Sequence, residues 1–210
     1  MGGGSGVVRV EILGPVRALH GGRQGTFSSP GQRAVLGLLA LAGGRPVTRA
    51  ELVDALWEAT EPPPTAANVI QTHVKNLRRL LEPDRAARSR SAALPRVGDG
   101  YAIGASEVDL VRFRALAAEA TEAARRAELA TAVGIWQRAL ALWRGAPLVD
   151  VPSLAQHPKV VALTEERRLV VSRYRAAMIT VGRAADVRRR LGAPELLQPR
   201  SRPTKLGSRG

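Results

Sequence analysis

Between residues 68 and 79, the chain places amide, hydroxyl and cationic side chains at helical spacing. At about 100° per residue they fall in one sector of a helix or on its flanks. Side-chain amides can form paired hydrogen bonds with adenine, lysine or arginine can bond guanine, and threonine can contact the thymine methyl. This chemistry suits the reading of base edges in duplex DNA, with Arg78 better placed for a phosphate. The residues are Asn68, Gln71, Thr72, Lys75, Asn76, Arg78 and Arg79.

The opposite sector of the same segment is apolar. Ile70, Val74, Leu77 and Leu81 recur at spacings of three and four, which predicts a helix buried along one narrow face. Prolines precede the segment and Pro83 follows it, so the helix is bounded on both sides. Taken alone, the polar face fits an ordinary solvated helix surface as well as a DNA-reading surface.

Two shorter helices are predicted before this one. Ser29 begins a capping-box pattern in which Gln32 can reach back, and the helix runs to Gly43-Gly44. Thr48 and Glu51 repeat the pattern for a second helix. Two short, capped helices would therefore support the helix that carries the polar face.

Short strands are predicted on both sides of the helices. Alternating apolar residues over 8–12 indicate a first strand, and two more flank the glycine-rich turn after His20. Gly98-Asp99-Gly100 is the turn of a hairpin that follows the third helix. Arg96, near the base of this hairpin, would lie beside the adjacent DNA backbone or minor groove, as in a wing.

From Asp109 onward the pattern is helical. Apolar spacing predicts a helical hairpin over about 109–143 and a third long helix over about 158–178. Trp136 and Trp143 belong to one apolar stripe, and such stripes are more often core than ligand pocket.

The chain of 210 residues carries a formal net charge of +14, which suggests a polyanionic partner. Of its 32 basic residues only three are lysines, so a coding bias toward arginine is an alternative source of the charge. We expect residues 181–210 to form a basic, disordered tail, because their apolar side chains are too few to offset the entropy of ordering.

Other classes of protein are disfavoured by what the sequence lacks. There are no cysteines and the three histidines are scattered, so we predict no metal site and no cofactor. No phosphate-binding loop, metalloprotease motif or triad spacing is present, which argues against an enzyme. The longest apolar run, Val35–Ala42, is too short for a membrane span and a signal-peptide pattern is missing, so we expect a cytoplasmic, nucleoid-associated protein.

Several stretches resemble the Streptomyces antibiotic regulatory proteins. They are VEILGPV (10–16), QRAVL (32–36), LVDALW (52–57), QTHVKNLRRLL (71–81), GDGY (98–101) and ALALWRG (139–145). The resemblance covers about residues 8–178 and implies an α+β winged helix-turn-helix of the OmpR type followed by an all-α TPR-like helical domain. We therefore expect a winged-helix DNA-binding domain over 1–105, a partial bacterial transcriptional activator domain over 106–180, and the tail over 181–210.

The resemblance also implies a function. Members of this family are pathway-specific activators of antibiotic biosynthetic clusters that bind direct repeats in double-stranded DNA side by side and recruit RNA polymerase holoenzyme. Glu58, Thr60 and Glu61 lie in the loop that faces polymerase in this family, although the residues alone indicate only an inter-helix connection. A homodimer on DNA is the candidate assembly. Lys75-Asn76 stands where the family usually has a small residue followed by arginine, so the operator sequence is not given by the resemblance.

Two alternative functions stay open at this point. One is a helical-repeat adaptor whose winged helix contacts proteins, and a DNA-binding test separates it from a regulator. The other is a shortened regulator that binds DNA without activating, because the match to the activator domain fades near Met178.

Overall fold

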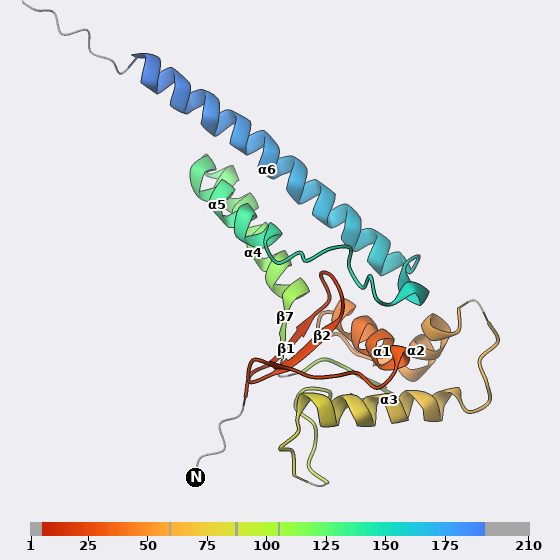
Figure 1. The fold of residues 1–210 in the computed structure, drawn as a ribbon. Coiled ribbons are helices and arrows are strands. Elements are labelled where there is room, and N and C mark those ends of the chain that lie inside the picture. The colour runs from red at the N-terminus through yellow and green to blue at the C-terminus, as the bar shows by residue number, and fades with distance from the viewer. Residues whose placement is uncertain (1–5, 59, 87, 105, 192–210) are drawn as a thin grey trace, which may run out of the picture.

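The computed structural model describes residues 6–58, 60–86, 88–104 and 106–191, with side chains up to residue 185. An α+β winged-helix unit is followed by an all-α unit, as the sequence predicts (Figure 1). Within the described residues, no helix combines the length and apolar character of a membrane span. The same part of the chain contains no group of three or more acidic or histidine side chains that could hold a metal ion.

A four-stranded sheet with the order β3-β2-β1-β7 forms one side of the winged-helix unit. Strand β1 pairs antiparallel with β2 and parallel with β7, and β2 pairs antiparallel with β3. Strand β7 comes from far along the chain and leads directly into the first helix of the all-α unit, so this sheet joins the two units. The strands are β1 (Val8–Glu11), β2 (Arg17–His20), β3 (Arg23–Gln24) and β7 (Glu107–Val108).

Three helices follow: α1 (Pro30–Leu41), α2 (Arg49–Leu56) and α3 (Ala66–Leu81). Thr48 and Glu51 form the complete predicted capping box at the start of α2. At α1, Ser29 Oγ accepts from the Gln32 amide at 3.4 Å, but the Gln32 carboxamide accepts from the Ser28 amide instead of reaching Ser29. The capping box predicted at the start of α1 is therefore only half formed.

The wing is a second, three-stranded sheet with the order β4-β6-β5. Its strands are β4 (Val47–Thr48), β5 (Arg96–Val97) and β6 (Gly100–Tyr101). Gly98 has φ +59°, which suits the tight turn between β5 and β6. A Cβ on Gly100 would lie 2.1 Å from the Val47 carbonyl oxygen, so the hairpin lies closely against β4 and the start of α2. The predicted hairpin is confirmed.

The all-α unit consists of α4 (Asp109–Arg125), α5 (Leu129–Leu140), a short 3-10 turn η1 (Pro152–Leu154) and α6 (Pro158–Leu191). Trp136 and Trp143 are buried, and the ring of Phe113 meets that of Trp143 edge-on at 5.2 Å. The tryptophan stripe therefore belongs to the core, as predicted.

Helix α6 is longer than the sequence predicts. It continues past Met178 to Leu191, so residues 181–191 of the expected tail are helical. The apolar periodicity ends where α6 extends beyond α5. The loss of a packing partner does not by itself end a helix. Alanine and arginine, which dominate residues 183–191, are strong helix formers, and a Gly-Ala-Pro sequence follows only at 192–194. The rest of the predicted tail, 192–210, lies outside the described residues.

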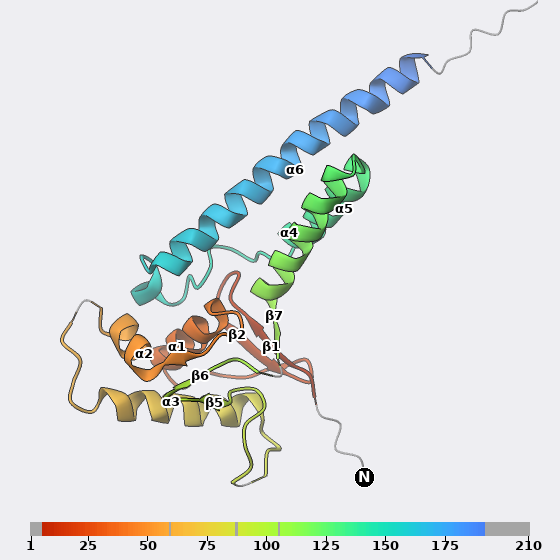
Figure 2. The same ribbon diagram turned by 180° about the vertical axis from the view of Figure 1, so that it is seen from behind.

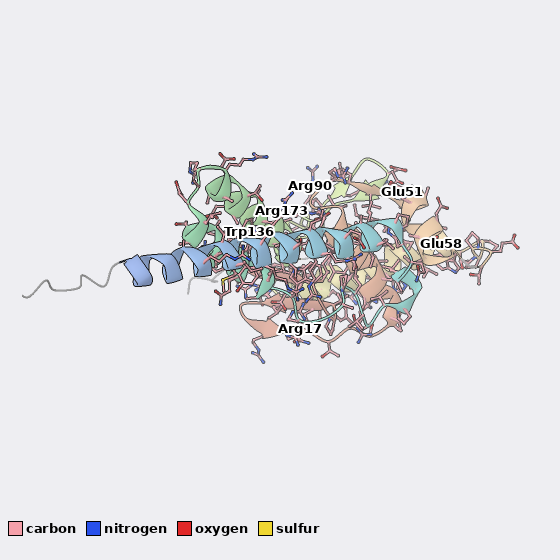
Figure 3. The ribbon with its side chains drawn as sticks, turned by 90° about the horizontal axis from the view of Figure 1, so that it is seen from above. Arg17, Glu51, Glu58, Arg90, Trp136 and Arg173 are labelled. Atoms are coloured by element: carbon pink, nitrogen blue, oxygen red, sulfur yellow. The ribbon has the colours of Figure 1, made fainter. Side chains whose placement is uncertain are left out.

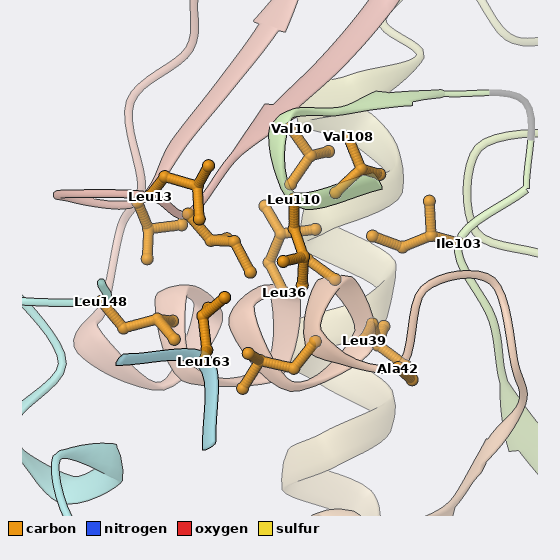
Figure 4. Packing of buried hydrophobic residues seen from close by; sticks show 14 of the residues in the cluster. Val10, Leu13, Leu36, Leu39, Ala42, Ile103, Val108, Leu110, Leu148 and Leu163 are labelled. Atoms are coloured by element: carbon orange, nitrogen blue, oxygen red, sulfur yellow. The ribbon is translucent and has the colours of Figure 1, made fainter. Parts of the chain in front are cut away.

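One hydrophobic core serves both units. Leu36 and Leu39 of α1 pack in the same cluster as Leu110 of α4, Leu148 and Leu163 (Figure 4). A glycine in α1, at position 37, allows this approach, since a Cβ there would lie 2.2 Å from the Leu148 Cδ2. The winged helix and the helical unit are therefore packed together directly rather than joined by a flexible linker.

The turn between β1 and β2, residues 12–16, is held by the helical unit through main-chain hydrogen bonds. The amide of Leu148 donates to the carbonyls of Ile12 (3.1 Å) and Gly14 (2.9 Å). The amide of Arg144 donates to the carbonyl of Leu13 at 2.7 Å, and its guanidinium donates to the Pro15 carbonyl at 3.0 Å. Backbone groups that would otherwise be buried without partners are thus satisfied across the junction.

Two carboxylates complete this junction. Asp109, at the start of α4, accepts hydrogen bonds from the amides of Ile12 and Leu13, each at 2.9 Å. Burial raises the pKa of Asp109 above its usual value. The hydrogen bonds from these amides and the nearby Arg144 guanidinium lower the pKa, but by less than burial raises it. Asp150 accepts from the amide of Val16 at 2.8 Å.

Candidate nucleic-acid interface

Helix α3 presents its predicted polar face to solvent. Ile70, Val74, Leu77 and Leu81 are at most 1% exposed and pack toward the core, which confirms the predicted apolar sector. In Figures 1 and 2, α3 lies along the lower edge of the molecule, on the side opposite α6. The polar side chains therefore face away from the body of the protein, as a base-reading helix requires.

An open groove of about 480 Å³ runs between α3 and the wing. Six of the eight residues predicted to bind DNA line it, together with three others. The lining residues are Arg49, Asn68, Gln71, Thr72, Val74, Lys75, Arg78, Arg96 and Tyr101. Four of them are cationic and none is acidic, so the groove is electropositive and matches a polyanion.

Arg49 was not predicted as a site residue. It is the first residue of α2, and its Nε donates to the carbonyl of Asp99 in the wing turn at 2.9 Å. In the sequence, Arg49 is recognisable only as the residue that follows the helix cap Thr48. Pairing of β4 with β6 brings it into the groove, and this pairing joins segments about 50 residues apart.

Arg96 holds the same wing turn from the other side. Its Nε donates to the carbonyl of Gly98 at 3.2 Å, and its side chain is exposed. Arg49 and Arg96 therefore fix adjacent carbonyls of one turn while lining the groove with positive charge. A wing held in this way is ordered before DNA binds, which lowers the entropic cost of docking.

Arg78 connects α3 to the wing. Its Nε and Nη2 donate to the carbonyl of Leu94 at 3.0 and 2.7 Å, and its guanidinium lies 5.6 Å from the ring centre of Tyr101. The side chain is half-buried. The structure thus gives Arg78 a structural contact, and the phosphate contact assigned from the sequence stays a prediction.

We expect Arg78→Ala to lower the free energy of unfolding by about 1–3 kcal/mol, because the carbonyl of the fully buried Leu94 would lose both donors. Urea unfolding measures the change. Arg79→Ala, at the exposed neighbouring position, serves as the control and should change stability by no more than about 0.5 kcal/mol. Equal stabilities of the two variants would contradict the structural role of Arg78.

The remaining predicted residues of α3 have distinct surroundings. Asn76 is half-buried and Arg79 is exposed, and neither lines the groove. The hydroxyl of Thr72 donates to the carbonyl of Asn68 at 3.0 Å, so it is occupied within the helix. The contact predicted for Thr72 uses its methyl group and does not depend on the hydroxyl.

The predicted polymerase-contact loop precedes the N-terminal end of α3. Glu58, Thr60 and Glu61 are exposed, and the amide of Thr60 donates to the carbonyl of Trp57 at 2.9 Å. Figure 3 shows Glu58 and Glu51 together at one end of the molecule. The loop is therefore open to solvent, and its contact with polymerase stays a prediction.

Comparisons with known proteins identify both units. Residues 24–103 match the family "Transcriptional regulatory protein, C terminal", and residues 108–199 match the family "Bacterial transcriptional activator domain". The winged helix, the groove and these two matches define a two-unit transcriptional regulator.

Individual relatives show to which family of transcriptional regulators the chain belongs. The chain is 34% identical over 192 residues to the regulatory protein DnrI of Streptomyces peucetius, covering 89% of this chain and 70% of DnrI. It is 39% identical over 166 residues to the regulatory protein AfsR of Streptomyces coelicolor, covering 78% of this chain and 16% of AfsR. The chain belongs to the Streptomyces antibiotic regulatory protein family of transcriptional activators, and it spans only a small part of the AfsR length.

A solved structure supports the fold. The structure titled "Mycobacterium tuberculosis EmbR in complex with low affinity phosphopeptide" aligns with a TM-score of 0.76 and 31% identity, over 90% of this chain and 50% of that chain. The predicted winged helix followed by a helical unit is thus confirmed by a relative as well as by the fold itself.

Proposed function

We propose that this protein is a sequence-specific DNA-binding regulator that activates a secondary-metabolite biosynthetic cluster. The observation that carries the proposal is the groove between α3 and the wing, with four cations, no acidic lining residue and a wing turn fixed by two arginines. Relatives named as transcriptional and regulatory proteins, among them RedD and DnrI, support the same function. Neither catalysis nor a cofactor enters this proposal.

Helix α3 reads the bases in this proposal. Its 16 residues span about 24 Å, and a major groove admits one such helix. Gln71 or Asn76 would bond adenine, and Lys75 or Arg79 would bond guanine. Arg49, Arg78 and Arg96 lie on the side toward the wing and would contact phosphates, which position the protein without selecting sequence.

The assembly that we propose is two copies side by side on direct repeats, as a homodimer on DNA, in contact with RNA polymerase in the bacterial cytoplasm. Glu58 and Glu61 are exposed carboxylates in a chain whose net charge is +14, so they suit a basic patch on the polymerase. Their position beyond the end of α3 would leave them accessible while the groove holds DNA.

The decisive experiment is a mobility shift with the full chain on the promoter regions of its own neighbouring genes. We expect a retained complex that survives competition by an unrelated duplex of equal length, because base contacts add affinity that phosphates alone do not supply. No complex at low salt would overturn the proposal and favour the protein-binding adaptor.

Removal of the loop carboxylates should separate binding from activation. We expect Glu58→Ala with Glu61→Ala to leave operator affinity within about twofold and to lower activated transcription in a purified system by about fivefold, the effect of about 1 kcal/mol. Glu119→Ala with Glu128→Ala removes equal charge from the exposed helical unit and should change neither. Equal transcription from the loop variant and this control would exclude the polymerase contact.

A further inference from the structure

Helix α6 extends past the end of α5 and away from the rest of the molecule in both Figure 1 and Figure 2. The last buried side chain of its described part is Ala177, and residues 182–185 are exposed on every side of the helix. Figure 3 shows the same end projecting beyond the body of the protein. Packing against α5 therefore accounts for the first part of α6, and the second part has no packing role in the described structure.

The part of α6 from Arg167 onward, which includes its projecting end, is strongly basic. Residues 167–191 contain eight arginines and one aspartate, so they carry +7 of the chain's +14. Arg168, Arg175 and Arg183 are exposed and lie about 10–12 Å apart along the axis, on the side opposite the buried Val170 and Ala177. Like charges this close repel one another, and a polyanion relieves that repulsion.

The first two of these arginines also share a hollow. A depression of about 350 Å³ is lined by Arg167, Arg168, Val171, Ser172 and Arg175. Arg168 pairs with Glu165 at 2.9 Å, but both side chains are more than half exposed, so this ion pair is weak and exchangeable. Arg175 and Arg168 can therefore turn toward an incoming phosphate at little cost.

The location of this surface separates it from the base-reading helix. Helix α3 and the projecting part of α6 lie at opposite edges of the molecule in both Figure 1 and Figure 2. A straight duplex seated on α3 would lie on that side of the molecule, away from the projecting end of α6. The charge on α6 consequently does not belong to the groove described above.

We propose that the outer face of α6 is a second, sequence-independent DNA-binding surface, which holds a different duplex segment from the one read by α3. Arginines spaced along a helix can contact successive phosphates without base contacts. A membrane surface fits less well, because the exposed apolar residues of this region, Leu169, Met178 and Ile179, point to different sides of the helix and form no broad apolar face. One protein molecule would then connect its operator to a second duplex or to a distant segment of the same one.

The test uses the full chain and two duplexes. An operator duplex is fixed to beads, the protein is added, and capture of a labelled, unrelated duplex is measured. We expect capture by the wild type and at least a fivefold loss for Arg168→Gln/Arg175→Gln/Arg183→Gln, with operator affinity unchanged. Three lost phosphate contacts should also reduce the log–log salt slope of second-duplex binding by about 2.7.

The matched control removes the same charge elsewhere. Arg112→Gln/Arg125→Gln/Arg138→Gln neutralises three exposed arginines of α4 and α5 and should retain capture. An equal loss from this control would attribute capture to net charge and overturn the proposal. Preferential capture of single-stranded RNA or of phosphatidylserine vesicles through the same arginines would also overturn it.

The α6 surface rests on the proposed function only in that both bind DNA. The α6 surface and base reading by α3 can therefore be refuted separately. Wild type that binds its operator but captures no second duplex would refute the α6 surface and leave the regulator intact. Conversely, Lys75→Ala/Arg79→Ala, which removes two predicted base contacts, should still bind the unrelated duplex through α6. Loss of that binding in the Lys75/Arg79 variant would show that α3 alone binds DNA and would refute the α6 surface.

Discussion

Alanine in place of Lys75 is expected to lower affinity for the cognate operator by about 5- to 150-fold, equivalent to about 1–3 kcal/mol, while affinity for unrelated duplexes changes little. Lys75 is exposed, lines the groove and lies in the middle of the outward face of α3, where a base-edge contact is geometrically available. Because a base contact contributes only on the correct sequence, its loss should bring the cognate and unrelated affinities closer together. Titrations on operator and scrambled duplexes at one salt concentration measure both.

Two further variants test whether the effect of Lys75→Ala comes from a base contact. Arg112→Ala removes an exposed cation from α4, remote from the groove, and should leave the ratio of the two affinities as in wild type. Asn76→Ala should lower the ratio if the amide bonds adenine, although Asn76 is half-buried and lies beside the groove. If Lys75→Ala weakened both duplexes by the same factor, Lys75 would contact phosphate, and the assignment of base reading to it would be wrong.

The second large effect concerns the junction between the two units. We expect Asp109→Ala to lower the free energy of unfolding by about 3–5 kcal/mol, because it leaves the buried amides of Ile12 and Leu13 without an acceptor. It also removes the carboxylate 3.5 Å from Arg144, whose side chain is mostly buried. Urea unfolding followed by circular dichroism measures the loss, and both units should unfold in one transition because they share a core.

Glu107→Ala is the matched control for Asp109→Ala. Glu107 lies two residues away, and its ion pair with Arg9 at 3.2 Å is about half exposed, so its removal should cost less than about 1 kcal/mol. A loss below 1 kcal/mol for Asp109→Ala, or two separate unfolding transitions in the wild type, would contradict the shared core.

The raised pKa of Asp109 adds a pH dependence to the junction. A carboxyl whose pKa is higher in the folded than in the unfolded state binds its proton more tightly when folded. Its contribution to stability is therefore greatest below the unfolded pKa and declines as pH rises through the folded pKa. Asp109→Asn, which cannot titrate, should lack this decline when unfolding is compared across mildly acidic pH.

The features that the sequence predicted correctly depend on neighbours in the chain. Helix caps such as Thr48 with Glu51, the apolar sector of α3 and the Gly98 turn are set within a few residues, so local pattern is enough. The family resemblance added the order of the elements and the class of regulator. Most of the groove could be predicted for the same reason, because the six predicted residues that line it lie on the polar face of one helix or in one hairpin.

The features that the sequence did not predict depend on distant segments. Arg49 enters the groove only because β4 pairs with β6, and Arg78 bonds Leu94 only because the wing folds back onto α3. The capture of residues 12–16 by Asp109, Arg144 and Leu148 joins positions about 100 residues apart or more. Helical wheels treat each element by itself and contain no information about such contacts.

The way in which residues 12–16 are held has a consequence for engineering regulators of this kind. The hydrogen bonds at that junction use main-chain groups of the turn, so they do not depend on which side chains the turn carries. Packing constrains the side chains instead, because Ile12, Leu13 and Val16 are buried in the core and a Cβ on Gly14 would lie 2.9 Å from the Arg144 Cβ. A chimera that transplants a foreign winged helix onto this helical unit should therefore dock correctly, provided that its turn keeps the same length, the glycine and the buried apolar side chains, and that Asp109 and Asp150 are retained. The winged-helix unit of one regulator could then be combined with the helical unit of another.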